Sequence, residues 1–119
     1  MKIALQHELN ERLEEAFHSY GLAGLTLATD EGLLLASYGH GLDLEYIAAI
    51  SPIARTSTQK VQELTESLRS KGIRFNILGL RLKEQSLFLC AAGTNDAVHS
   101  PGLKTLLRNL AQMVAAVPV

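Results

Sequence analysis

The residues of this sequence best suited to bind a metal or to transfer a proton are its four histidines, His7, His18, His40 and His99. His7 and His18 fall eleven residues apart in a segment with helical periodicity, which separates them by about 16 Å along a helix axis. They therefore cannot share a metal ion. His40 lies between two glycines, His99 precedes Ser100, and no histidine pair has the spacing typical of ligands on one helix. We interpret all four as solvated side chains and expect neither a metal nor a cofactor.

The single cysteine, Cys90, is the other candidate for chemistry, as a nucleophile activated by a histidine. Its neighbours are apolar, and such surroundings raise a thiol pKa and make the group inert, so a core cysteine is the favoured interpretation. Asp30 and Glu31 form a carboxylate pair, but they precede Gly32 in a segment that reads as a turn. The sequence contains no phosphate-binding glycine motif. No catalytic residue is predicted.

Composition favours one independently folding domain over residues 1–119. The chain is 47% hydrophobic, enough for a core without a disulfide, which a single cysteine could not form within the chain. Formal net charge is −1, with eleven basic residues interspersed among twelve acidic ones, so no nucleic-acid partner is expected. The first residues turn polar too early for a signal peptide, and no apolar run approaches the roughly 20 residues of a membrane span. We expect a cytoplasmic protein without membrane insertion.

Hydrophobic spacing predicts an amphipathic helix over residues 3–20, followed by a β-hairpin. The hairpin strands cover 22–29 and 33–38, joined by an acidic turn that ends in glycine. In the first strand the small residues Gly24, Thr26 and Ala28 alternate with leucines. This alternation indicates that one face of the strand lies under a closely packed element.

A long second helix is predicted over residues 44–71, with Asp43 as its N-cap. Its apolar residues recur at alternating spacings of three and four and form a seam that can pack on a sheet. Pro52 must either kink this helix or start its main part after Ser51. Ala49 and Ile53 form a second stripe that would face outward, as at a protein interface.

The remaining segments complete a mixed α/β (α+β) fold. Residues 73–82 read as one or two strands with a bulge or turn at Gly79, and 86–92 read as a central strand. A last helix begins after Ser100. We expect one mostly antiparallel sheet of four to five strands, with a long central helix on one face and N- and C-terminal helices, in the order α-β-β-α-β-(β)-β-α.

This element order resembles the roadblock family, also called the dynein light-chain roadblock family, which includes the bacterial gliding-protein regulators. Residues 24–36 match its signature of a small-residue strand, an acidic turn with glycine and a second apolar strand. Residues 45–50 match the alanine-rich start of its second helix. Two features depart from the family pattern. Pro52 falls where the family helix continues, and residues 73–92 are short for the three strands that the family has there.

The resemblance implies a non-enzymatic scaffold or regulator that forms a homodimer, or a heterodimer with a sister domain, and binds a Ras-like small GTPase. In such dimers the long helices pair and the sheets join edge to edge. The candidate interface residues, for the dimer or the GTPase, are Tyr46, Ala49, Ile50, Ile53, Ser57, Lys60, Val61, Arg74 and Asn76.

Two other functions fit the same sequence. The first is a sensory domain of the profilin or PAS type, which would hold a small molecule in an apolar pocket between the sheet and the long helix. The second is a small hydrolase that uses Cys90 or the histidines, and it is the weaker of the two because no motif supports it.

Overall fold

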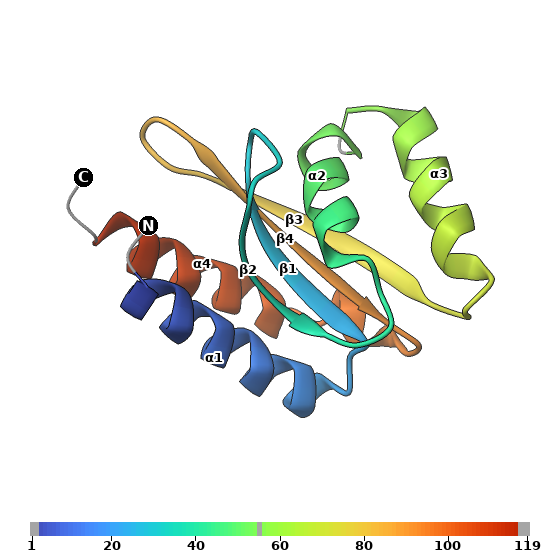
Figure 1. The fold of residues 1–119 in the computed structure, drawn as a ribbon, viewed down its shortest axis with the longest axis horizontal. Helices are drawn as coiled ribbons and strands as arrows, with labels where there is room; N and C mark the ends of the chain where they lie inside the picture. Colours follow the sequence, from blue (N-terminus) through green and yellow to red (C-terminus); the bar gives the residue numbers. More distant parts are fainter. Residues whose placement is uncertain (1–2, 55, 117–119) are drawn as a thin grey trace.

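The computed structural model describes residues 3–54 and 56–116 and shows helices on both sides of one sheet (Figure 1). The elements are, in order, α1 (Ile3–Tyr20), β1 (Gly24–Thr29), β2 (Leu34–Gly39), α2 (Leu44–Ala54), α3 (Thr58–Arg69), β3 (Arg74–Arg81), β4 (Ser86–Gly93), a short 3-10 helix η1 (Asp96–His99) and α4 (Gly102–Ala115).

The sheet has four antiparallel strands in the order β2-β1-β4-β3. The expected α/β fold with a mostly antiparallel sheet is therefore confirmed, with the lower of the two strand counts. β4 lies between β1 and β3, as its almost wholly apolar sequence predicts, whereas β2 and β3 form the two edges.

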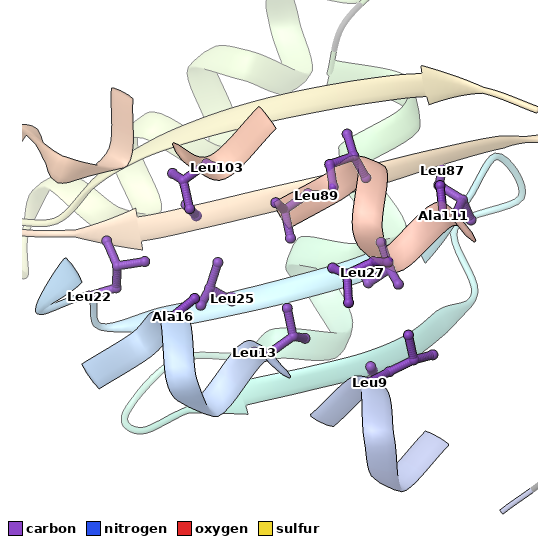
Figure 2. Close-up of a cluster of buried hydrophobic side chains, with 14 of the residues drawn as sticks. Leu9, Leu13, Ala16, Leu22, Leu25, Leu27, Leu87, Leu89, Leu103 and Ala111 are labelled. Atoms are coloured by element: carbon purple, nitrogen blue, oxygen red, sulfur yellow. The ribbon is translucent and has the colours of Figure 1, made fainter. Parts of the chain in front are cut away.

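Two hydrophobic clusters cover the two faces of this sheet. The larger joins the sheet to α1 and α4, and Figure 2 shows its leucines meeting between helix and strand. Its fully buried members include Leu9, Leu13, Leu25, Leu27, Leu87, Leu89, Leu103 and Leu110. The smaller joins the sheet to α2 and α3 and consists of Ile47, Ile50, Ala54, Leu64, Leu68 and Cys90. Both faces of the central strands are thus buried.

The small residues of β1 lie under α2, as their alternation predicts. A Cβ atom added at Gly24 would stand 3.1 Å from Leu42, in the loop before α2, and 3.2 Å from Leu44, the first residue of the helix. Further along the same face, Thr26 and Ala28 are 1% and 0% exposed. Larger side chains at these positions would push α2 away from the sheet.

The predicted long helix is divided into α2 and α3, and the division does not occur at the proline. Pro52 lies inside α2, and the helix ends two residues later at Ala54. A proline removes one intrahelical hydrogen bond, so the helix weakens at this point. The backbone N–H groups of Thr56 and Ser57 both donate to the Ile53 carbonyl, and Ser57 then caps α3. Arg55, within the break, lies outside the described residues.

The bulge or turn predicted at Gly79 is absent, because β3 pairs with β4 without a register shift from Arg74 to Arg81. The apolar residues change face for another reason. Phe75 and Ile77 pack against the smaller cluster, whereas Leu78 and Leu80 pack against the larger one. Different helices cover the two halves of β3, on opposite faces of the sheet. Its apolar residues therefore change face while the backbone stays regular.

We predict that Gly32→Ala destabilises the fold more than Gly41→Ala. Both glycines have positive φ, 82° and 74°, so each substitution costs about 1–2 kcal/mol for the left-handed backbone alone. At Gly32 the new Cβ would also stand 3.0 Å from the Cα and carbonyl oxygen of Ala49, whereas at Gly41 nothing lies within 4 Å. Urea unfolding should show a further loss of about 1 kcal/mol at Gly32. Equal losses would contradict the contact between the hairpin loop and α2.

Candidate protein-interaction surface

An apolar stripe runs along the solvent side of α2. Tyr46 and Ile53 are 38% and 47% exposed, and Ala49 between them is also exposed. Their spacings of three and four residues place them on one face of the helix. The neighbouring positions Ile47 and Ile50 are 3% and 6% exposed and face the sheet. Of the candidate interface residues, Tyr46, Ala49 and Ile53 are thus accessible, whereas Ile50 belongs to the core.

The hairpin loop adds a fourth exposed apolar side chain, Leu33, which the sequence predicts as the first residue of the second hairpin strand. β2 begins at Leu34, which leaves Leu33 in the loop with 60% of its surface exposed. Thr29 Oγ1 accepts the backbone N–H groups of Glu31 (3.3 Å) and Leu33 (3.2 Å) and holds the loop closed. In the sequence, Leu33 is recognisable only as a leucine that directly follows the turn glycine, Gly32.

The backbone of Gly32 lies against Ala49, so the loop that carries the exposed Leu33 adjoins α2. Leu33, Tyr46, Ala49 and Ile53 together are called the α2 patch below. A group of large apolar side chains left in solvent on neighbouring elements is typical of a protein-binding surface.

Ser57, Lys60 and Val61, the candidates on α3, have structural roles. Ser57 Oγ accepts the backbone N–H of Lys60 at 3.3 Å and so caps the helix. Lys60 Nζ lies 3.1 Å from Glu63 Oε2, an i,i+3 pair in which both side chains are about 40% exposed. Such a pair contributes well under 1 kcal/mol. Val61 packs against the smaller cluster.

Arg74 and Asn76, the candidates on β3, connect this strand to η1. Arg74 Nη1 lies 2.8 Å from Asp96 Oδ1, and Asn76 Nδ2 donates to the Val98 carbonyl at 3.1 Å. The structure therefore separates the nine candidates into the accessible residues of α2, the buried Ile50, the first turn of α3, and the start of the edge strand β3.

The histidines do not form a metal centre within residues 3–54 and 56–116, where no group of three potential ligands lies together. His7 Nε2 is 2.9 Å from Glu11 Oε1 on the same helix. His18 and His40 both lie beside the Tyr38 ring, with centroids 5.9 and 5.6 Å away. This cluster was not predicted from the sequence, since α1 and β2 bring together residues about twenty positions apart.

Cys90 lies in the core, as predicted, with 1% of its surface exposed. Burial raises the pKa of its thiol from 9.0 to about 12. A neutral, inaccessible thiol is a poor nucleophile, which leaves the hydrolase hypothesis without its best candidate.

The part of the chain that the structure describes contains no helix with the length and apolar character needed to cross a membrane.

The architecture described above is the roadblock-like fold, so the resemblance noted in the sequence is confirmed at the level of fold. Searches by sequence match neither a family model nor a curated protein. Solved structures of MglB gliding proteins are similar to this chain.

The MglB gliding protein of Thermus thermophilus superposes with a TM-score of 0.66 at 19% identity, covering 98% of this chain and 96% of that one. MglB of Myxococcus xanthus gives 0.55 at 12% identity, covering 96% and 89%. An MglB described with a tetrameric arrangement gives 0.59 at 20% identity, covering 95% and 92%. At these identities the likeness establishes the shared fold, over nearly the full length of both chains.

We predict that Cys90 resists alkylation in the folded protein. At pH 8 a pKa near 12 leaves about a thousandfold less thiolate than a pKa of 9.0, and burial slows access further. Iodoacetamide should therefore modify the protein in strong urea but not in buffer, as followed by intact mass. Comparable rates in both conditions would contradict a buried thiol.

The same shift predicts how stability changes with pH. A thiol whose pKa is higher in the folded than in the unfolded state stabilises the fold fully below the unfolded value. That contribution should be lost as pH rises from about 9 towards 12. Cys90→Ala should remove this part of the pH dependence in urea titrations.

Proposed function

We propose that this protein is a cytoplasmic, non-enzymatic scaffold or regulator that self-associates and binds a Ras-like small GTPase. The α2 patch is the single observation that carries the proposal, because it exposes large apolar side chains on a fold shared with the MglB gliding proteins. One of these proteins is described in a tetrameric arrangement, which supports self-association in proteins of this fold.

The size of the α2 patch indicates how tight such a dimer is. Complete burial of a large apolar side chain contributes about 1.5–3 kcal/mol, and those of the patch are already partly covered. Association costs at least about 4 kcal/mol in lost freedom, so the patch by itself supports only a weak dimer, and neighbouring surface must add to it. Each apolar residue of the patch is then essential to the dimer.

The mechanism of the regulator is binding without a catalytic group of its own. Small GTPases exchange between conformations of their switch segments, and a protein that binds one conformation more tightly shifts that equilibrium. A regulator of this kind changes hydrolysis by ordering the residues of the GTPase itself. The buried, neutral thiol of Cys90 is consistent with such a role.

The sensor hypothesis is less well supported. It needs a ligand-sized space between the sheet and the predicted long helix, which forms α2 and α3. Beneath α2, Ile47, Ile50 and Cys90 pack together and are 3%, 6% and 1% exposed. Beside α3, an open groove of about 570 Å³ is lined by Val61, Ile73 and Phe75. Pockets for small molecules need several hundred cubic ångströms of free volume. The close packing beneath α2 argues against a small-molecule site there, so a ligand of the sensor hypothesis would have to bind in the open groove beside α3.

We predict that Ile53→Glu weakens self-association about tenfold or more, because a charge would enter the apolar interface. Sedimentation velocity over a concentration series measures the effect. Asn109→Glu, which adds the same charge at an exposed position of α4, should leave the dimer unchanged. Unfolding free energies of both variants should stay within about 0.5 kcal/mol of the parent protein. A dimer unaffected by Ile53→Glu would exclude the α2 patch as its interface.

We predict that a small GTPase is recovered with the tagged protein from native lysate, mainly when a non-hydrolysable GTP analogue replaces GDP. The difference is expected because the two nucleotides favour different switch conformations. Mass spectrometry identifies the bound protein, and hydrolysis by the purified GTPase is then measured with and without this chain. If no GTPase is bound and hydrolysis by the candidate is unchanged, the regulator function is wrong.

A further inference from the structure

A groove of about 400 Å³ runs between the later part of β3 and α4. It is formed by the helix that covers the face of the sheet opposite α2 and α3, so it lies away from the α2 patch. Leu78 and Leu80 of the strand and Leu107 of the helix give it an apolar floor. Its volume falls within the range of small-molecule sites, roughly 300–1,000 Å³.

Two basic side chains border this groove without a counter-ion. Lys104 and Arg108 are four residues apart, which places them one turn apart on the same side of α4. Neither forms an ion pair within the described residues, and α4 contains no acidic residue that could neutralise them. None of the described residues that line the groove is acidic. The groove therefore combines an apolar floor with two uncompensated positive charges.

This combination fits a small organic phosphate. A phosphate monoester carries a charge of about −1.5 to −2 at pH 7 and has three acceptor oxygens, which suits two cations one helical turn apart. The apolar part of such an ester can cover Leu78 and Leu80, which are only partly buried. Side chains alone would hold the phosphate, in agreement with a sequence that contains no phosphate-binding glycine motif.

Self-association along β3 would bring two such grooves together. β3 is an edge of the sheet within the described part of the chain, and from Arg74 to Arg81 it has neither a bulge nor a proline to prevent strand pairing. Two copies joined symmetrically at this edge are related by a two-fold axis, so the two strands run antiparallel and both α4 helices lie on the same face. Lys104 and Arg108 of the two copies then border the joint from opposite sides.

Four positive charges near one joint disfavour the dimer, because like charges repel each other across an interface. A phosphate bound in each groove neutralises the two cations of that copy and removes this repulsion. The ligand therefore binds the dimer more tightly than the monomer. By mass action, a ligand that prefers the dimer shifts the equilibrium between monomer and dimer towards the dimer.

We infer that the groove between β3 and α4 binds a small, soluble organic phosphate, and that the bound ligand strengthens self-association. Lys104 and Arg108 hold the phosphate group, and the leucines of the floor contact the apolar part of the ligand. The inference rests on the self-association proposed above and adds a ligand that controls it. The edge of β3 itself stays available to the second copy, because the ligand lies on the face of the sheet.

The test uses the full chain labelled with ¹⁵N in phosphate-free buffer, with octyl phosphate below its micelle concentration as the probe. We expect saturable shifts of the backbone amides of residues 77–80 and 104–108. In sedimentation velocity, the dimer dissociation constant should fall about tenfold when the probe is saturating. Octyl glucoside, an uncharged amphiphile with the same alkyl chain, should cause neither effect. Inorganic phosphate should bind about tenfold more weakly or less, because it lacks the apolar contacts.

Paired substitutions separate the charge of the groove from the overall charge. Lys104→Gln with Arg108→Gln should weaken binding of octyl phosphate about tenfold or more and should strengthen the dimer in its absence, because the repulsion is removed. Arg12→Gln with Lys83→Gln removes the same charge at exposed sites that do not line the groove, and should change neither property. The urea unfolding midpoints of both double variants should stay close to that of the parent protein.

Several outcomes would overturn the inference. These are the absence of shifts at millimolar octyl phosphate, equal binding of octyl glucoside, a dimer unaffected by the bound probe, and equal effects of both pairs of substitutions. Binding to vesicles that contain phosphatidic acid, without a response to octyl phosphate, would assign the two cations to a membrane surface instead. A chain that stays monomeric with and without the probe would contradict the proposed self-association together with this inference, whereas a dimer indifferent to the probe contradicts this inference alone.

Discussion

The close contact between α2 and the small-residue face of β1 is the constraint on which the rest of the arrangement depends. Because Gly24 has no side chain, Leu42 before the helix and Leu44 at its start can approach β1 closely. The buried Thr26 and Ala28 are small, so α2 can lie close to the same face of the strand. With α2 in this position, its opposite side is left in solvent, and the hairpin loop lies against it through Gly32. The exposed patch is therefore a consequence of how the helix is seated. A bulkier β1 would move the patch and the loop together.

Much of the fold follows from local sequence signals. The hairpin is fixed by its acidic turn, α2 by the Asp43 cap, whose Oδ1 accepts the Tyr46 N–H at 3.1 Å, and β4 by its continuous apolar run. The break between α2 and α3 was misplaced because Pro52 is a strong signal, whereas Ser57 reads equally well as part of a helical seam. The pattern around Gly79 was misinterpreted because periodicity alone does not show that a strand is covered on both faces.

The candidate surface was predictable only in part. Helical periodicity distinguishes the two sides of α2, so the exposure of Ala49 and Ile53 was foreseen, yet Ile50 on the buried side was assigned to the same surface. Leu33 was missed because an apolar residue beside a turn reads as the start of a strand.

The unequal size of the two hydrophobic clusters has a consequence for dynamics. Among the described residues, sixteen buried ones join the sheet to α1 and α4, but only six join it to α2 and α3. Local opening requires the least free energy where the fewest buried contacts are lost, so α2 and α3 should detach transiently while the opposite layer stays intact. The layer formed by α1 and α4 is thus the more stable side of the sheet. The other, held by fewer buried side chains, is the layer that opens more readily.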